Sequence, residues 1–182
     1  EDLFVAPRGD SRTIRAIVRY GNVAGSQGSV IPLLLAQRAT GTVELTDPRM
    51  TRFFLTLGEA VRWTKRRIEL MEPNSIYVPV LPSTRLIDLA EAIAPDTRIR
   101  WIGTRGQEKI HEVMVAIDES RSAARFSDPV FDYWRLGADG AGREFTYTSD
   151  QPERWLDVAA IRAALPRAMA DVGHAEQMEL VA

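Results

Sequence analysis

The sequence predicts a mixed α/β domain, and three observations support this. Short runs rich in β-branched residues alternate along the chain with amphipathic runs of helical spacing. The chain has 182 residues, 45% of them apolar and 26% charged, which suits one domain with a sizeable core. The predicted strands are short and their connections vary in length. We therefore expect an α/β or α+β arrangement rather than one regular doubly wound sheet.

Five runs are predicted strands because β-branched residues, or alternating apolar and polar residues, dominate them. They are residues 13–20, 42–45, 75–80, 98–102 and 131–136. The first is expected to be buried. The third contains Pro79, which lacks a backbone N–H and therefore predicts a place toward the edge of a sheet. Residues 109–116 fit a strand or a helix equally well.

Four runs are predicted helices because apolar residues recur at three- to four-residue spacing. They are residues 30–39 with Ser29 as N-cap, residues 56–70, a run from Ser83 as N-cap through Ile93, and residues 153–164. The buried face of the second helix is predicted to comprise Leu57, Ala60, Val61, Thr64 and Ile68. The chain after Pro166 carries no strong signal.

Composition excludes several classes of function. A net charge of −2 without a block of like charges does not indicate a nucleic-acid or membrane-surface protein. The absence of cysteine excludes a disulfide framework, a zinc finger and a cysteine nucleophile. With only His111 and His174 present, no metal site is expected. No apolar run approaches the roughly 18 residues of a membrane span. The N-terminus has no signal-peptide core, so the expected location is the cytoplasm.

The loop after the first predicted strand carries the most specific signal. Residues 19–32 read RYGNVAGSQGSVIP. They resemble the RYGNVxGSRGSVIP segment of inverting UDP-N-acetylglucosamine 4,6-dehydratases, which belong to the extended short-chain dehydrogenase/reductase superfamily. Four further segments follow in that family's order: TDPRMTRFF at 46–54, IYVP at 76–79, IDLAEAIAP at 87–95 and IGTRGQEKIHE at 102–112. The resemblance runs in register from residue 12 to residue 165. Five motifs in the family's order are specific evidence for the resemblance, whereas a single motif would be weak evidence.

The resemblance implies the C-terminal part of such an enzyme. It assigns residues 1–30 to the end of a Rossmann sheet, residues 31–165 to a smaller α/β nucleotide-sugar-binding domain, and residues 166–182 to a tail. The GxGxxG cradle and the YxxxK catalytic motif are absent from the sequence. We therefore expect Glu1 to follow directly on the catalytic segment and no catalytic residue in this chain. An N-terminal Rossmann half, in cis or in trans, is expected to hold NADP or NAD, and a homo-oligomer is also implied.

Five residues match binding positions of the family. Asn22, Arg52, Arg105 and Glu108 match substrate-binding positions, and Tyr20 matches a position beside the nicotinamide. Two arginines can clamp a diphosphate through charge-assisted hydrogen bonds, and Glu108 can accept hydrogen bonds from ribose hydroxyls. Asn22 offers both a donor and an acceptor. The helix that begins after Ser29 favours an anion at its N-terminus.

Plainer roles stay open for the same residues. Arg52 would then be a surface arginine in a helix-initiating turn, and Arg105 and Glu108 an intrahelical ion pair. Asn22 would close an Asx-turn, and Tyr20 would be a core aromatic.

Other residues receive an expectation of their own. His111 is expected to be a hydrogen-bonded structural histidine. The basic cluster on the second helix is expected to face solvent or an acidic partner; it comprises Arg62, Lys65, Arg66 and Arg67. Gln27 stands where the family has arginine, and Gly106-Gln107 stands where it has Pro-Gly. Both changes bear on sugar preference and on strength of binding.

Three functions follow from these observations. The first is the UDP-sugar-binding half of an NADP-dependent UDP-N-acetylglucosamine 4,6-dehydratase that inverts C5 and serves bacterial surface-glycan or flagellin-glycan synthesis. The second is a nucleotide-sugar-binding module without catalysis, or another UDP-sugar dehydratase or epimerase of the superfamily. The third is a structural subunit that binds no UDP.

Overall fold

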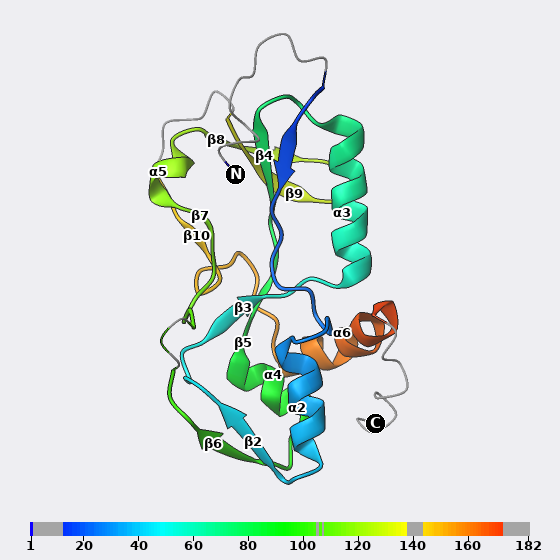
Figure 1. Ribbon diagram of the computed structural model, residues 1–182, viewed down its shortest axis with the longest axis vertical. Helices are drawn as coiled ribbons and strands as arrows, with labels where there is room; N and C mark the ends of the chain where they lie inside the picture. The colour runs from blue at the N-terminus through cyan, green and yellow to red at the C-terminus, as the bar shows by residue number, and fades with distance from the viewer. Residues whose placement is uncertain (2–12, 105, 107, 138–143, 173–182) are drawn as a thin grey trace. The chain divides into compact units, whose positions relative to one another are not determined.

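The computed structural model describes residues 1, 13–104, 106, 108–137 and 144–172 (Figure 1). They form two units, each assembled from three stretches of chain. Unit 1 draws on Glu1–Tyr20, Ala60–Val80 and Val113–Thr148, and unit 2 draws on Gly21–Glu59, Leu81–Glu112 and Ser149–Ala182. Within the described ranges, no helix is long and apolar enough to cross a bilayer.

The sheet of unit 1 has four strands in the order β1-β4-β9-β8. Strand β1 (Ala16–Val18) pairs parallel with β4 (Ser75–Pro79), whereas β9 (Asp132–Leu136) pairs antiparallel with both β4 and β8 (Ala123–Ser127). Two short strands, β7 (Val113–Val115) and β10 (Tyr147–Thr148), form a separate antiparallel pair, and the short helix α5 (Ile117–Ser120) follows β7. The ambiguous run 109–116 is therefore a strand over three residues only.

Two expectations for this sheet are wrong. Strand β4 lies inside the sheet and not at its edge. Pro79 is tolerated because it is the last residue of the strand, and the N–H of Val80 donates to the carbonyl of Asp132 at 2.8 Å. Strand β1 is half-buried along its length, not buried.

Helix α3 (Leu57–Leu70) has the predicted bounds to within one residue but buries a different face. Its buried residues are Ala60, Trp63 and Arg67, whereas Val61 and Ile68 are 57% and 62% exposed. Trp63 donates from its indole N–H to the carbonyl of Arg19 at 3.1 Å. The expected face was correct at Ala60 and wrong at Val61 and Ile68, because the rest of the buried face consists of Trp63 and the charged Arg67.

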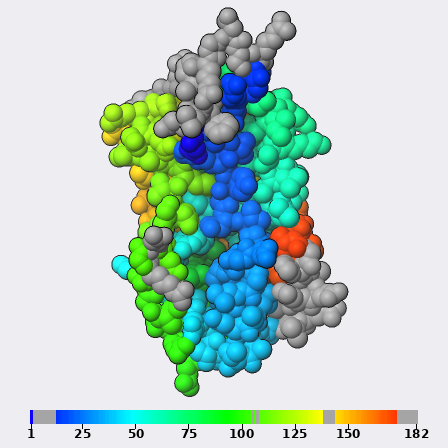
Figure 2. Space-filling model, in the orientation of Figure 1, coloured from blue at the N-terminus to red at the C-terminus, as the bar shows by residue number. Residues whose placement is uncertain are grey.

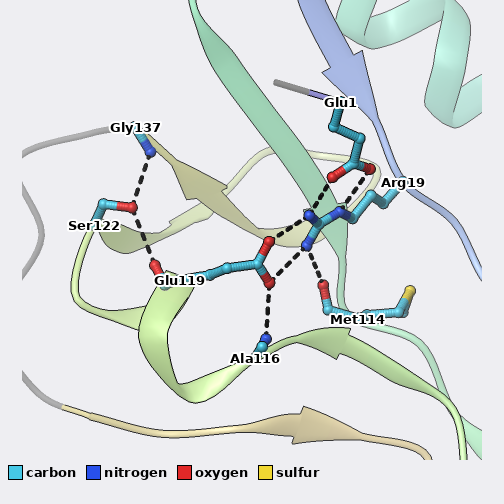
Figure 3. A network of polar contacts seen from close by, with 7 residues as sticks. All are labelled: Glu1, Arg19, Met114, Ala116, Glu119, Ser122 and Gly137. Atoms are coloured by element: carbon cyan, nitrogen blue, oxygen red, sulfur yellow. Dashed lines mark hydrogen bonds and ion pairs between the residues drawn. The ribbon is translucent and has the colours of Figure 1, made fainter. Parts of the chain in front are cut away.

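Arg19 joins the first and the third stretch of unit 1 through a network of polar contacts (Figure 3). Its guanidinium donates to the carboxylates of Glu1 and Glu119, and it donates to the carbonyl of Met114 at 2.7 Å. Glu119 also accepts the N–H of Ala116 at 2.9 Å. The hydrogen bond from Arg19 is the main cause that lowers the pKa of Glu119 below its ordinary value. Hydrogen bonds to Glu1, and then to Glu119, raise the pKa of Arg19.

This network predicts an acid-sensitive contribution to stability. A carboxylate with a lowered folded-state pKa stabilises the fold above its unfolded pKa of about 4.3 and loses that contribution as the pH falls through the folded value. Glu119→Gln is therefore expected to lower the free energy of unfolding at pH 7 and to flatten its fall below pH 4.5. Urea titrations at several pH values measure this. Asp118→Asn, which removes an exposed carboxylate on the same turn, is the control. An unchanged pH profile for Glu119→Gln would refute the prediction.

The described residues of unit 2 form two small pairs of strands and three helices. Strands β2 (Thr42–Leu45) and β6 (Arg98–Trp101) pair parallel, and β3 (Thr51–Phe53) pairs antiparallel with β5 (Ser83–Arg85). Helices α2 (Val30–Arg38), α4 (Leu86–Ile93) and α6 (Val158–Asp171) share one apolar core with β2. The largest contributors to that core include Leu34, Leu45, Met50, Ile93, Ile161 and Met169.

Two helix boundaries in unit 2 differ from expectation. Ser83 lies in β5, and α4 begins at Leu86 with Arg85 as its N-cap. Helix α6 begins later, with the Asp157 side chain accepting the N–H of Ala160 at 2.8 Å, and continues through Pro166 to Asp171. Burial of apolar residues on both sides of Pro166 outweighs the hydrogen bond that a proline removes from a helix interior.

The glycine loop that opens unit 2 depends on a close approach at Gly21. A Cβ placed on Gly21 would lie 2.5 Å from the Cβ of Phe53, which is itself buried. Gly21→Ala is therefore expected to destabilise the protein by about 1–3 kcal/mol, as overpacking does. Thermal and urea unfolding measure this. Gly106→Ala is the matched control, because nothing lies within 4 Å of an added Cβ there. Equal stability of the two variants would contradict this packing.

Candidate functional site

Unit 2 contains a pocket of about 650 Å³. The start of α2, the end of β2, Arg52 of β3 and the segment after β6 line it. The lining residues that matter below are Gly28, Ser29, Val30, Arg52 and Glu108. In the space-filling view, α2 in blue and the green segment after β6 lie next to each other on the visible face (Figure 2).

A second pocket of about 200 Å³ shares Gly28, Ser29, Val30 and Arg52 with the first. Its remaining wall is mostly apolar and includes Val23, Ile31 and Phe54. Asn22, which is exposed, contributes a polar group to this wall. The two pockets therefore adjoin each other at Arg52 and the first turn of α2.

Arg52 is held in place by the protein itself. One Nη donates to the carbonyls of Thr51 at 2.7 Å and Ile110 at 3.1 Å, and Nε lies 3.7 Å from a carboxylate oxygen of Glu112. The side chain is only 20% exposed. These contacts show that Arg52 belongs to a strand and lines a pocket, so a surface arginine in a helix-initiating turn is the wrong interpretation. They also fix a cation at the pocket wall.

The first turn of α2 adds further hydrogen-bond donors. Ser29 is the N-cap by position, as predicted, but its side chain makes no capping hydrogen bond. Its hydroxyl oxygen is buried and has no hydrogen-bond partner among the described residues. The first turn contains no acidic residue to offset the positive potential of the helix N-terminus, and Val30 and Ile31 supply N–H groups there whereas Pro32 has none.

The turn between β2 and β3 directly precedes the strand that contains Arg52. Asp47 accepts the Arg49 backbone N–H at 2.8 Å and pairs with the Arg49 guanidinium at 2.7 Å. The Arg49 side chain is the main cause that lowers the pKa of Asp47 to about 2, with help from the Arg49 backbone N–H. This Asx-type turn is a local reason for the turn that follows β2.

The five residues predicted from the family motifs have different outcomes. Arg52 and Glu108 line the larger pocket together, and Asn22 and Arg52 line the smaller one. Glu108 is exposed and lies outside any helix, so an intrahelical pairing is not its role. Arg105 lies outside the described residues. Tyr20 belongs to unit 1 and is 50% exposed, which excludes a core aromatic.

Residue-by-residue reasoning missed two features that shape the site. One is the buried hydroxyl of Ser29 beside both pockets, and the other is the pairing of Glu112 with Arg52. Both residues stand inside quoted motifs, GSV and HE, so the signal was present. The motifs alone do not indicate that the Ser29 hydroxyl is buried or that Glu112 pairs with Arg52.

The arrangement suits an anion flanked by hydroxyl groups. Arg52 and the first turn of α2 present positive potential to the same space, whereas Glu108 presents acceptors at its rim. The described residues contain no group of three His, Cys, Asp or Glu side chains placed to hold a metal ion. The site is therefore a candidate binding site for a phosphorylated, hydroxyl-rich molecule.

Comparison with known proteins agrees with this chemistry. The sequence pattern of the polysaccharide biosynthesis protein family matches residues 3–131. The UDP-N-acetylglucosamine 4,6-dehydratase (inverting) of Campylobacter jejuni is 35% identical over 176 residues, which cover 85% of this chain and 53% of the relative. The UDP-glucose 4-epimerase of Rickettsia conorii is 36% identical over 145 residues, which cover 77% of this chain and 41% of the relative.

A solved structure supports the fold. The X-ray structure of Pen from Bacillus thuringiensis aligns with a TM-score of 0.78 and 28% sequence identity, covering 91% of this chain and 53% of that one. The predicted α/β class and the resemblance drawn from five ordered motifs are both confirmed. The chain spans about half the length of the curated relatives it matches. This chain belongs to the polysaccharide biosynthesis protein family, and its relatives include UDP-sugar dehydratases and epimerases.

Proposed function

We propose that this chain is the UDP-sugar-binding half of an inverting UDP-N-acetylglucosamine 4,6-dehydratase that serves bacterial surface-glycan or flagellin-glycan synthesis. The observation that carries the proposal is Arg52, fixed by two carbonyls and Glu112 at the wall of a pocket of about 650 Å³. The Campylobacter relative named for this activity supports the choice of reaction.

In this proposal the diphosphate lies between Arg52 and the first turn of α2. The arginine contributes charge-assisted hydrogen bonds, and the helix N–H groups add neutral ones. Arg105, which lies outside the described residues, is proposed to complete the clamp. Glu108 is proposed to accept hydrogen bonds from the ribose hydroxyls. Asn22 is proposed to contact the sugar from the smaller pocket.

The chemistry of water elimination needs groups that this chain does not supply. Its sequence has no YxxxK motif and no glycine-rich dinucleotide cradle. NADP or NAD, which accepts and returns a hydride when bound, is therefore proposed to be held mainly by a Rossmann half in cis or in trans. Tyr20, half-exposed in unit 1, is the one residue of this chain proposed to lie beside the nicotinamide.

Two assays test the proposal in sequence. Calorimetry with UDP is expected to show binding to this chain, and uridine, which lacks the diphosphate, is expected to bind much more weakly. The complete protein, with its Rossmann half, is expected to convert UDP-N-acetylglucosamine to a 4-keto-6-deoxy product with inverted C5. No binding at millimolar UDP would overturn the proposal and favour a structural subunit.

A second function is supported by the epimerase relatives and by the missing catalytic motif. If UDP binds and the complete protein interconverts UDP-sugars at C4 without loss of water, the protein is an epimerase. If UDP binds and no Rossmann half is found in cis or in trans, a nucleotide-sugar-binding module without catalysis is the better description.

A further inference from the structure

A buried polar cluster in unit 2 lies directly behind Arg52. It consists of Thr51, His111 and Ser149, of which Thr51 is 4% and Ser149 is 0% exposed. The Thr51 hydroxyl lies 2.9 Å from His111 Nδ1 and 2.7 Å from the Ser149 hydroxyl. Because Ser149 is completely buried and contacts His111 only through Thr51, the cluster is not a nucleophile with its base.

The direction of the hydrogen bonds in the cluster depends on where the single Ser149 hydroxyl proton points. The Ser149 hydroxyl accepts the N–H of Glu112 at 2.8 Å and lies 3.1 Å from the carbonyl of Thr51, to which it can donate. In that arrangement Thr51 donates to Ser149 across their 2.7 Å contact, and His111 donates from Nδ1 to Thr51. In the reverse arrangement Ser149 donates to the Thr51 hydroxyl, Thr51 donates to His111 Nδ1, and the imidazole proton lies on Nε2. The tautomer of His111 therefore distinguishes the two arrangements.

The cluster fastens residues 110–112 to the strand that carries Arg52. The carbonyl of Ile110 accepts both the Thr51 N–H and an Arg52 Nη, each at 3.1 Å. The carbonyl of Glu112 accepts the Ser149 N–H at 2.9 Å, and the Glu112 carboxylate lies 3.7 Å from Arg52 Nε. The groups that orient the guanidinium thus flank His111 on either side along the chain.

We propose that His111 is a positioning residue that orients Arg52 for nucleotide binding. It does so by donating a hydrogen bond from Nδ1 to the Thr51 hydroxyl. This bond holds the Ile110 carbonyl and the Glu112 carboxylate in place. These two groups in turn orient the Arg52 guanidinium at the pocket wall. The same bond anchors the end of the segment that carries Glu108. The proposal rests on the proposed function in one respect, since its binding readout is UDP.

The tautomer is tested first, on the unaltered protein. The sequence contains only two histidines, so a ¹⁵N spectrum of the imidazoles is assigned by comparison with His111→Asn. The expected result at neutral pH is a protonated Nδ1 and an unprotonated Nε2 for His111. A protonated Nε2 with a bare Nδ1 would overturn the proposal, whatever the protein binds.

Binding variants then separate positioning from folding. His111→Leu is expected to weaken UDP binding roughly three- to tenfold, the effect of one lost hydrogen bond. His111→Asn, whose amide N–H can replace Nδ1–H, is expected to restore most of the affinity. Should His111→Leu fail to fold, Thr51→Ser and Thr51→Val form the equivalent pair, with only the serine variant retaining affinity. Melting temperatures identify variants that are merely unfolded.

The outcomes distinguish this proposal from the proposed function. Unaltered UDP affinity in folded His111→Leu, together with weakened binding in Arg52→Ala, would overturn the positioning role and leave the UDP site standing. An unaltered protein that binds no UDP would overturn both.

Discussion

Replacing Arg67 by alanine is expected to lower the free energy of unfolding by about 3–5 kcal/mol, because it breaks a buried ion pair and removes the nearest cation of its partner. Arg67 is 1% exposed, and its guanidinium pairs with Asp128. The guanidinium carbon also lies 4.3 Å from the ring centre of Tyr133 and 4.6 Å from that of Trp63. The expected basic face of α3 is therefore wrong at Arg67, which is a core residue of unit 1.

The Arg67→Ala variant would retain the Asp128 carboxylate in its largely buried position. Burial acts to raise the pKa of this carboxyl, but N–H groups of Phe131 and Val130 and the charge of Arg67 outweigh that effect and lower it. Without Arg67, the carboxylate would keep the desolvation cost and lose its nearest cation, while Arg66 Nε would stay 3.8 Å away. The aromatic rings would also lose a cation that packs against their faces.

Urea unfolding followed by tryptophan fluorescence measures the loss, and Trp63 lies beside the altered site. Arg62→Ala, which removes an exposed charge from the same helix, is the control and is expected to change stability by no more than about 0.5 kcal/mol. Arg67→Met keeps most of the volume and isolates the charge. A loss below about 1 kcal/mol for Arg67→Ala would contradict this description of the core.

Replacing Arg52 by alanine is expected to weaken UDP binding by about 1.5–3 kcal/mol, which is roughly a 10- to 150-fold loss of affinity. The variant removes the charged donor that the protein fixes at the pocket wall. It also leaves the Glu112 carboxylate without the cation 3.7 Å away, so the local charge becomes less favourable for a diphosphate. Uridine, which has no phosphate, is expected to lose much less affinity.

Arg49→Ala is the matched control for charge. Arg49 lies three residues earlier, its side chain is 72% exposed, and it pairs with Asp47 rather than lining the pocket. Calorimetry with UDP on both variants is expected to show a large loss for Arg52→Ala and almost none for Arg49→Ala. Equal losses would mean that Arg52 acts only through the net charge of the protein.

Much of the secondary structure could be predicted because its signals are local. Strand β2 was predicted to the residue, and α2, β6 and β9 to within one residue at either end. The buried face of α3 could not be predicted, because arginine is a surface residue unless aromatic rings and a carboxylate enclose it. Those partners come from distant segments around Tyr77, Asp128 and Tyr133.

The site could be predicted only in part, for a similar reason. Family motifs indicated Arg52 and Glu108, and the structure places both at one pocket. The orientation of Arg52 depends on a carbonyl of Ile110 and on the cluster behind it, and backbone carbonyls leave no trace in a sequence pattern. His111 was expected to be a hydrogen-bonded histidine, and its 2.9 Å contact with Thr51 confirms this.

The central claim is that UDP binds in unit 2 with its diphosphate between Arg52 and the start of α2. The most direct test is a UDP titration of the ¹⁵N-labelled chain, followed through the backbone amide resonances. We expect the largest changes at Gly28, Ser29, Arg52 and Glu108, which line the pocket. Changes confined to unit 1, or none at saturating UDP, would contradict the claim.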